Sequence, residues 1–306
     1  MLPRAYARGY EDIMMKTNSL GYKVRQYLLF AGVTTFLFVA VVIVPFFYGL
    51  YLTFTRYDGV STSKPFVGLD NYIAAFGDTD YWVSLGRTFV FSAIAVVLVN
   101  LFAFVLAYMV TTGIRGQNFF RAGFFIPNLI GGIVLGYVWK FVFNKALVQL
   151  SDMIGSGHAK SLLATPTGAM AALIIVSVWQ YAGYMMLIYV AGFMSVSEDV
   201  IEAAKIDGCT GTQSIIHISI PLMTASFVQC LFLTITRCFM VYDVNFSLTG
   251  GDPYGDSVLA AMHVYNTAFQ DKKFGLGQAE ALILFVVCAI VGGLQVYVGK
   301  KAEVQA

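Results

Sequence analysis

Residues 195–222 read SVSEDVIEAAKIDGCTGTQSIIHISIPL, a charged and polar interval in a chain that is otherwise dominated by apolar runs. The spacing of Ser195 and Glu198 predicts a capping box at the start of a helix, and a second acidic residue follows near the positive helix end. Gly208 stands where a helix end favours positive φ, and Pro221 predicts a break before the next apolar run. The stretch therefore predicts two short helices joined by a hinge, placed between two long apolar segments.

The composition of the whole chain explains why this polar interval is unusual. Of 306 residues, 58% are hydrophobic and 12% are charged, and the mean hydropathy is +0.74. Soluble domains carry about 25% charged residues, so the chain is expected to be an integral membrane protein. It contains no G-x-x-x-x-G-K-[ST] phosphate-binding loop and no catalytic constellation. We expect a protein that is not an enzyme, needs no metal or cofactor, and takes its energy from a partner.

Six apolar segments are long enough to cross a bilayer, which takes about 20 residues each. They cover residues 28–54, 88–110, 122–143, 168–193, 223–246 and 279–298. The basic excess in residues 1–26 predicts a cytoplasmic N-terminus, and Arg115, Arg121 and Lys300-Lys301 agree with that orientation. Five lysines in the predicted outer loops weaken the charge argument. Both termini and residues 195–222 are expected on the cytoplasmic side of a bacterial cell membrane.

A resemblance supports this orientation. Glu202-Ala203-Ala204, three residues, Gly208, nine residues and Ile218-x-Ile220-Pro221 resemble the EAA motif of bacterial ABC-importer permeases, which reads E-A-A, three residues, G, nine residues, I-x-L-P. Ile220 replaces the usual Leu. The resemblance implies that residues 195–222 are a cytoplasmic coupling loop that docks on a separate ATPase. Its implied coupling residues are Glu202, Ala203, Ala204, Asp207 and Gly208.

Further elements resemble the carbohydrate-uptake branch of these permeases, including the glycerol-phosphate and multiple-sugar systems. FVGLDNY at Phe66–Tyr72 resembles F-x-G-L-x-N-Y, LTGGDP at Leu248–Pro253 resembles L-T-x-G-G-P with Asp252 as a departure, and YNTAF at Tyr265–Phe269 resembles Y-x-x-A-F. The resemblance implies one all-α transmembrane domain over residues 1–306, with the fold of a type I importer permease. It also implies a second homologous permease subunit, two copies of an ATP-binding subunit and an extracytoplasmic solute-binding protein.

Arg237 is a charged residue in the middle of the fifth predicted span, LFLTITRCFMVYD. Even on the lenient insertion scale, a charge there costs at least about 2.5 kcal/mol, so an intramembrane arginine is by default a functional hypothesis. The alternative is a structural ion pair with Asp243 or Glu280. Glu280 opens the sixth predicted span, where it could pair with Arg237 or face the outer solvent.

Thr234, Arg237, Cys238 and Val241 have the i, i+3, i+4, i+7 spacing of one helix face. Residues 221–249 resemble the larger permease subunit of maltose importers, and this resemblance implies that the four contact sugar. The same resemblance, aligned through Trp179, implies sugar contacts for Gln180, Tyr181 and Tyr184. Aromatic faces and amide groups suit a sugar, whereas the guanidinium also suits a carboxylate or phosphate. A neutral sugar and an acidic sugar or sugar phosphate therefore both stay open, beside ordinary helix packing.

Three other classes of membrane protein fit the sequence less well. A secondary transporter should show coupling-ion sites and inverted repeats, and a membrane assembly protein has no use for a coupling loop. An amino-acid or peptide permease fits the sugar-type elements less well. Cys209, Cys230, Cys238 and Cys288 are expected to be packing residues, and His158, His217 and His263 isolated loop or interface residues.

Overall fold

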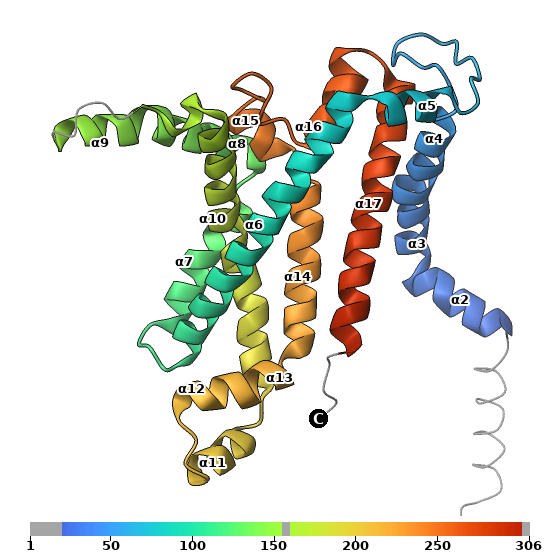
Figure 1. The fold of residues 1–306 in the computed structure, drawn as a ribbon. Helices are drawn as coiled ribbons and strands as arrows, with labels where there is room; N and C mark the ends of the chain where they lie inside the picture. The colour runs from blue at the N-terminus through green and yellow to red at the C-terminus, as the bar shows by residue number, and fades with distance from the viewer. Residues whose placement is uncertain (1–19, 155–159, 302–306) are drawn as a thin grey trace, which may run out of the picture.

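Helices form almost all the regular structure in the computed structural model, which describes residues 20–154 and 160–301 (Figure 1). One isolated antiparallel bridge, Thr55 with Phe66, is the exception in this part of the chain. Five helices are long and apolar enough to cross a membrane, and a sixth crossing results if one bent helix pair is counted as a span. The all-α membrane fold expected from the sequence is confirmed.

The elements before the polar interval are α2 (Leu20–Phe30), α3 (Gly32–Phe38), π-helical η1 (Val39–Ile43), α4 (Val44–Leu52), α5 (Asp70–Gly77), α6 (Thr79–Thr111), α7 (Gln117–Leu129), α8 (Gly132–Phe141), π-helical η2 (Val142–Ala146), α9 (Leu147–Met153), 3₁₀-helical η3 (Leu162–Ala164) and α10 (Pro166–Ser195). The elements that follow are α11 (Glu198–Ile206), α12 (Gly211–Ser214), π-helical η4 (Ile215–Ser219), α13 (Ile220–Leu222), α14 (Thr224–Phe239), α15 (Asp243–Leu248), α16 (Ala260–Tyr265), π-helical η5 (Asn266–Gln270) and α17 (Phe274–Lys301).

Helix α6 crosses the middle of the bundle and packs on α10, α14 and α16. Phe91 of α6 belongs to the same buried cluster as Leu173 of α10, and Ala103 of α6 to the same cluster as Met186 of α10. Helix α17 packs on α14 and reaches α4 and α5 at its start. Cys230, Cys238 and Cys288 are buried and all four cysteines are free, which fits the packing role expected for them.

The two ends of the bundle carry different elements (Figure 1). Helices α11 and α12 lie at one end, toward which the C-terminal end of α17 also points; we refer to it as the α11 end. Helices α5, α15 and α16 lie at the opposite end, the α16 end. Most of the basic segment predicted at residues 1–26 lies outside the described residues.

The third and fifth predicted spans, residues 122–143 and 223–246, are not single helices in the structure. Extended backbone at Ile130 and Gly131 separates α7 from α8, and the helix beginning at Gly132 continues to Met153, into the predicted outer loop over residues 144–167. Helix α14 ends at Phe239, and α15 begins only at Asp243. Apolar composition made each stretch read as one helix, because hydropathy does not register a backbone break.

Close packing between α8 and α15 accompanies both breaks. A Cβ on Gly132 would lie 2.6 Å from the Asp243 Cβ, and one on Gly136 would overlap the Ser247 side chain. Ser247 Oγ also donates to the Gly132 carbonyl at 3.3 Å. Gly132 thus permits a close helix approach, whereas Gly131 has no neighbour within 4 Å of such a Cβ.

Two spans begin earlier than predicted. Helix α6 begins at Thr79 rather than near residue 88, because Asp78 caps it by accepting hydrogen bonds from the backbone N–H groups of Asp80 (2.9 Å) and Tyr81 (3.1 Å). Helix α17 begins at Phe274 rather than near residue 279. Both helices extend past their apolar stretch, where the sequence predicted a polar outer segment.

The Phe66–Tyr72 element fastens α5 to the end of the first span. The Asn71 amide donates to the carbonyls of Thr53 (2.7 Å) and Thr55 (2.9 Å), and the Tyr72 hydroxyl donates to Thr53 Oγ1 at 2.8 Å. These bonds satisfy carbonyls that the helix end leaves free. Within the span, the π-helical turn η1 comes just before α4, which carries Pro45 in its first turn.

Candidate functional site

A cavity of about 330 Å³ lies at the break between α14 and α15. This volume is at the lower end of the range for small-ligand sites. It is lined by Gly132, Gln180, Tyr181, Arg237, Met240, Val241, Tyr242, Asp243 and Val244. The cavity therefore combines apolar and aromatic walls with an amide, a guanidinium and a carboxylate.

The Arg237 guanidinium is held in place by three neighbours. Its carbon atom lies 4.7 Å from the ring centroid of Tyr184 and 5.3 Å from that of Tyr181. Its Nη1 donates a hydrogen bond to Asn128 Oδ1 at 2.6 Å. Two aromatic faces and an amide oxygen thus stabilise the charge, and Arg237 has no ion pair among the residues that the structure describes.

Gln180 contributes an acceptor with no partner. Its Nε2 donates to the Ile130 carbonyl at 3.3 Å, at the break between α7 and α8. Its Oε1 is buried and has no hydrogen-bond partner among the described residues. An unpaired buried acceptor is costly, and a hydroxyl group of a ligand in the cavity could satisfy it.

The structure brings together most of the residues expected to contact substrate. Gln180, Tyr181, Arg237 and Val241 line the cavity, and Tyr184 packs on the guanidinium. Thr234 and Cys238 are fully buried and do not belong to the lining. Thr234 instead accepts a hydrogen bond from Asn100 Nδ2 at 3.3 Å, and the Tyr189 hydroxyl donates to Asn100 Oδ1 at 2.8 Å.

Two cavity features escaped sequence reasoning. Asn128, which holds Arg237, follows Pro127 in an apolar run, and a polar residue in such a run is a signal that could have identified it. Asp243 was expected only as an ion-pair partner of Arg237, yet it lines the cavity as a second charged group. Its position follows from the end of α14 at Phe239, which hydropathy alone does not reveal.

A larger cavity, of about 740 Å³, lies between α6, α7 and α10. Its walls are apolar and aromatic, including Phe102, Phe119 and Trp179. Among the described residues that line it, Trp179 alone has a polar side-chain atom, its indole N–H. One donor is too few to orient a sugar, which needs several polar contacts. The smaller cavity at Arg237 is the better candidate for a polar substrate.

The polar interval after α10 forms a separate candidate site at the α11 end. Glu202, Ala203, Asp207 and Gly208 are exposed, and Ala204 is buried. Gly208 has φ +83°, as predicted for a helix end, and nothing lies within 4 Å of a Cβ built on it. The glycine is therefore needed for its backbone conformation rather than for space. Ile206 is 86% exposed, which leaves an apolar side chain at the tip of α11 without a covering.

The capping box predicted at Ser195 is wrong. Ser195 is the last residue of α10 and its hydroxyl donates to the Gly192 carbonyl at 2.7 Å, while Ser197 precedes α11 without a side-chain cap. A capping box does occur in the segment, between Thr210 and Gln213 at the start of α12. After Pro221 the chain bends by 71° between the α12–α13 segment and α14, so the predicted break is confirmed.

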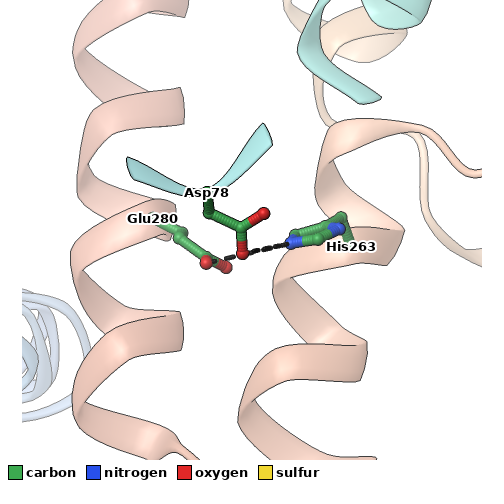
Figure 2. Close-up of side chains that lie close together, drawn as sticks. All are labelled: Asp78, His263 and Glu280. Atoms are coloured by element: carbon green, nitrogen blue, oxygen red, sulfur yellow. Dashed lines mark ion pairs between the residues drawn. The ribbon is translucent and has the colours of Figure 1, made fainter. Parts of the chain in front are cut away.

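Glu280 lies away from Arg237, near His263 and Asp78 at the α16 end (Figure 2). Neither predicted alternative for Glu280 holds, because it is fully buried and faces the imidazole. Burial opposes protonation of His263, but the nearby Glu280 and Asp78 carboxylates outweigh it and raise the pKa of His263 above its usual value. His263, which the sequence predicts as a loop or interface residue, lies in α16 beside two carboxylates.

Comparisons with known proteins identify the family. Residues 112–304 match the model of the binding-protein-dependent transport system inner membrane component family. The chain is 36% identical to a probable starch degradation products transport system permease protein of Thermoanaerobacterium thermosulfurigenes, over 91% of this chain and 95% of that protein. It is 31% identical to a multiple sugar-binding transport system permease protein of Streptococcus mutans, over 85% and 90% of the two chains.

The fold is similar to a crystal structure of a bacterial ABC transporter involved in the import of the acidic polysaccharide alginate. The TM-score is 0.78 at 18% identity, over 96% of this chain and 99% of that chain. The chain therefore belongs to the family of inner membrane components of binding-protein-dependent transport systems.

Proposed function

We propose that this chain is the membrane-spanning subunit of an ATP-driven ABC importer and forms the path for a sugar or oligosaccharide. An extracytoplasmic binding protein delivers the sugar at the α16 end. The carrying observation is the cavity at the break between α14 and α15, which presents aromatic faces, an unpaired amide acceptor and a guanidinium to one space. The relatives named for starch degradation products and multiple sugars support the substrate class.

The charges around the cavity favour a neutral sugar over an anionic one. Arg237 and Asp243 line the same cavity, so their formal charges cancel. Asn128 and two tyrosine rings already stabilise the guanidinium. Hydroxyl groups can donate to Asp243 and Gln180 and accept from Arg237, whereas an anion would meet the Asp243 carboxylate. An acidic sugar or sugar phosphate is the second candidate, because a guanidinium binds carboxylate or phosphate in bidentate fashion.

The α11 segment supplies the mechanical link in this proposal. Glu202, Ala203, Ala204, Asp207 and Gly208 would form a cytoplasmic coupling helix that contacts an ATP-binding subunit. The exposed Ile206 at its tip suits burial in a groove of that partner. Two ATP-binding subunits and a second homologous permease would complete the complex, and ATP-driven closure would rock the helices to give alternating access.

Transport by the complex in proteoliposomes tests the proposal. Tyr184→Ala should reduce uptake of the transported sugar, because it removes a face of the Arg237 site. Tyr137→Ala is the matched control, since this tyrosine lies on α8 and is 56% exposed. Loss of uptake only in the Tyr184 variant, with ATP hydrolysis retained, supports a substrate site. Equal uptake by both variants and the parent protein would refute it.

A further inference from the structure

A second cluster of ionisable side chains lies at the α16 end and shares no residue with the cavity at Arg237. Asp78 is the N-cap residue of α6, His263 lies in α16 and Glu280 lies in α17 (Figure 2). One ligand-type atom from each residue lies within 4.8 Å of the other two. Three segments far apart in the sequence thus direct a carboxylate, an imidazole and a second carboxylate toward one point.

The polar atoms at this point lack the partners that burial demands. Glu280 has 0% exposure, and both its carboxylate oxygens are without hydrogen bonds among the described residues. His263 Nε2 is also buried and unpaired, at 3.6 Å from Asp78 Oδ2 and 3.8 Å from Glu280 Oε1. Both distances exceed those of a hydrogen bond. A buried carboxylate without a hydrogen bond is costly, and such groups are normally paired closely with a cation or bound to a metal.

The two separations measured from His263 Nε2 are close to those that a metal ion requires, and the third, between the carboxylates, is at most 4.8 Å. Nitrogen and oxygen ligands lie about 2.0–2.2 Å from Zn²⁺ in tetrahedral geometry, which separates the ligand atoms by about 3.4 Å. The observed 3.6 Å and 3.8 Å separations lie within a few tenths of an ångström of that value. Asp78 keeps one oxygen, Oδ1, for capping α6 and leaves Oδ2 facing His263, so binding would not compete with the cap.

We propose that Asp78, His263 and Glu280 form a binding site for a divalent transition-metal ion, with Zn²⁺ the best match. A neutral imidazole and two carboxylates balance the charge of a divalent ion, and imidazole with carboxylate is a donor set that Zn²⁺ accepts. A water molecule would complete the fourth position, since Asp78 and His263 are only half-buried. The ion would tie the start of α6 to α16 and α17 at the α16 end.

The role of such a site would be structural. The three segments meet where α6 and α17 begin, and hydrogen bonds already join them from the Tyr81 hydroxyl to the Glu280 carbonyl (2.9 Å) and from the Ala260 N–H to Thr88 Oγ1 (2.8 Å). A bound ion would add a direct link between all three. This inference stands apart from the proposed sugar path, because Arg237 and Gln180 contribute nothing to the cluster.

Metal binding to the purified, chelator-treated complex tests the inference. The parent complex should bind one more Zn²⁺ ion per copy of this chain than complexes that carry Glu280→Gln or His263→Gln. Added Zn²⁺ should raise the unfolding temperature of the parent complex but not that of the two variants. Each substitution should weaken binding by more than about 10-fold, the loss that even an outer-shell substitution causes. His217→Gln is the control, because His217 lies in η4 at the α11 end.

Co²⁺ provides an independent readout that does not depend on stability. The parent complex should show the visible absorption of tetrahedral Co²⁺, and the His263→Gln complex should lack it while retaining sugar uptake and its elution volume. Equal Zn²⁺ content and equal Co²⁺ spectra in the parent and Glu280→Gln complexes would overturn the metal site. The cluster would then be a proton-bridged group in which His263 pairs with the two carboxylates.

Discussion

Arg237 carries the chemistry of the proposed sugar site, and its environment defines what a substitution should do. The guanidinium faces the cavity, donates to Asn128 and lies over two tyrosine rings. Arg237→Gln should reduce uptake of a neutral sugar about fivefold, the effect of losing one hydrogen bond of about 1 kcal/mol. Uptake of an anionic derivative, if it is a substrate, should fall about 10-fold or more, because charged hydrogen bonds contribute about 1.5–3 kcal/mol.

Uptake of both substrate types by one preparation measures that difference. Asp243→Asn should act in the opposite direction, improving uptake of the anion relative to the neutral sugar, because it removes the competing carboxylate. A uniform loss in both variants would indicate that Arg237 and Asp243 hold the break between α14 and α15 rather than substrate.

The residues of this site were predictable only in part. Arg237 stood out because a charge inside an apolar run is costly, and Gln180, Tyr181 and Tyr184 came from the family resemblance. Asn128 and the role of Asp243 depend on two backbone breaks that leave no mark in hydropathy. Thr234 and Cys238 share the helical spacing of Arg237 but are fully buried. Helix α14 packs on both α6 and α17, and spacing along the chain does not tell which residues of one face contact a neighbouring helix and which line the cavity.

At the scale of elements, α8 packs closely on α15, and Gly132 and Asp243 of this contact both line the cavity. Gly136→Ala should destabilise the protein by about 1–3 kcal/mol, the usual cost of inserting a methyl group into a packed contact. Gly131→Ala is the control, because nothing lies within 4 Å of the added Cβ. Thermal unfolding of the purified complex should therefore separate the two variants, and equal unfolding temperatures would show that α8 and α15 can move apart freely.

The α11 hinge makes a second prediction at this scale. Gly208 has φ +83° with open space around it, so Gly208→Ala should meet only the backbone penalty, about 1–2 kcal/mol. Gly208→Pro should be more severe, because proline fixes φ near −65°. Under the proposed function, the proline variant should insert in the membrane but lose sugar uptake and sugar-stimulated ATP hydrolysis. Uptake equal to that of the parent in the proline variant would contradict coupling through this segment.

Predictability at the element scale followed the physical signal. The hinge at Gly208, the break after Pro221 and the long apolar helices rest on local rules of backbone conformation and hydrophobic length. The early start of α6 depends on Asp78, which caps a polar first turn. A polar sequence of this kind is equally typical of a loop, so the sequence does not predict the helix start. The metal-type cluster depends on three segments far apart in sequence, and no spacing along the chain indicates such a meeting.

At the scale of the whole molecule, the proposed function requires the two ends of the bundle to face opposite compartments. Tyr254 is 93% exposed in the loop before α16, and Ile206 is 86% exposed at the end of α11. Helices α16 and α11 lie at opposite ends of the bundle (Figure 1). A cysteine at either position should react readily with a thiol reagent, because the buried native cysteines Cys230, Cys238 and Cys288 are shielded. Because Cys209 is only half-buried, both cysteine variants should be made in a chain that carries Cys209→Ser.

A membrane-impermeant maleimide applied to intact cells should label Tyr254→Cys and leave Ile206→Cys unlabelled, whereas permeabilised cells should show labelling of both. This pattern follows if the α16 end receives substrate from a binding protein and the α11 end contacts an ATP-binding subunit in the cytoplasm. Co-expression of that subunit should then slow labelling of Ile206→Cys in permeabilised cells, because docking buries the tip of α11. Labelling of Ile206→Cys in intact cells would reverse the orientation and remove the physical basis for ATP-driven coupling through α11.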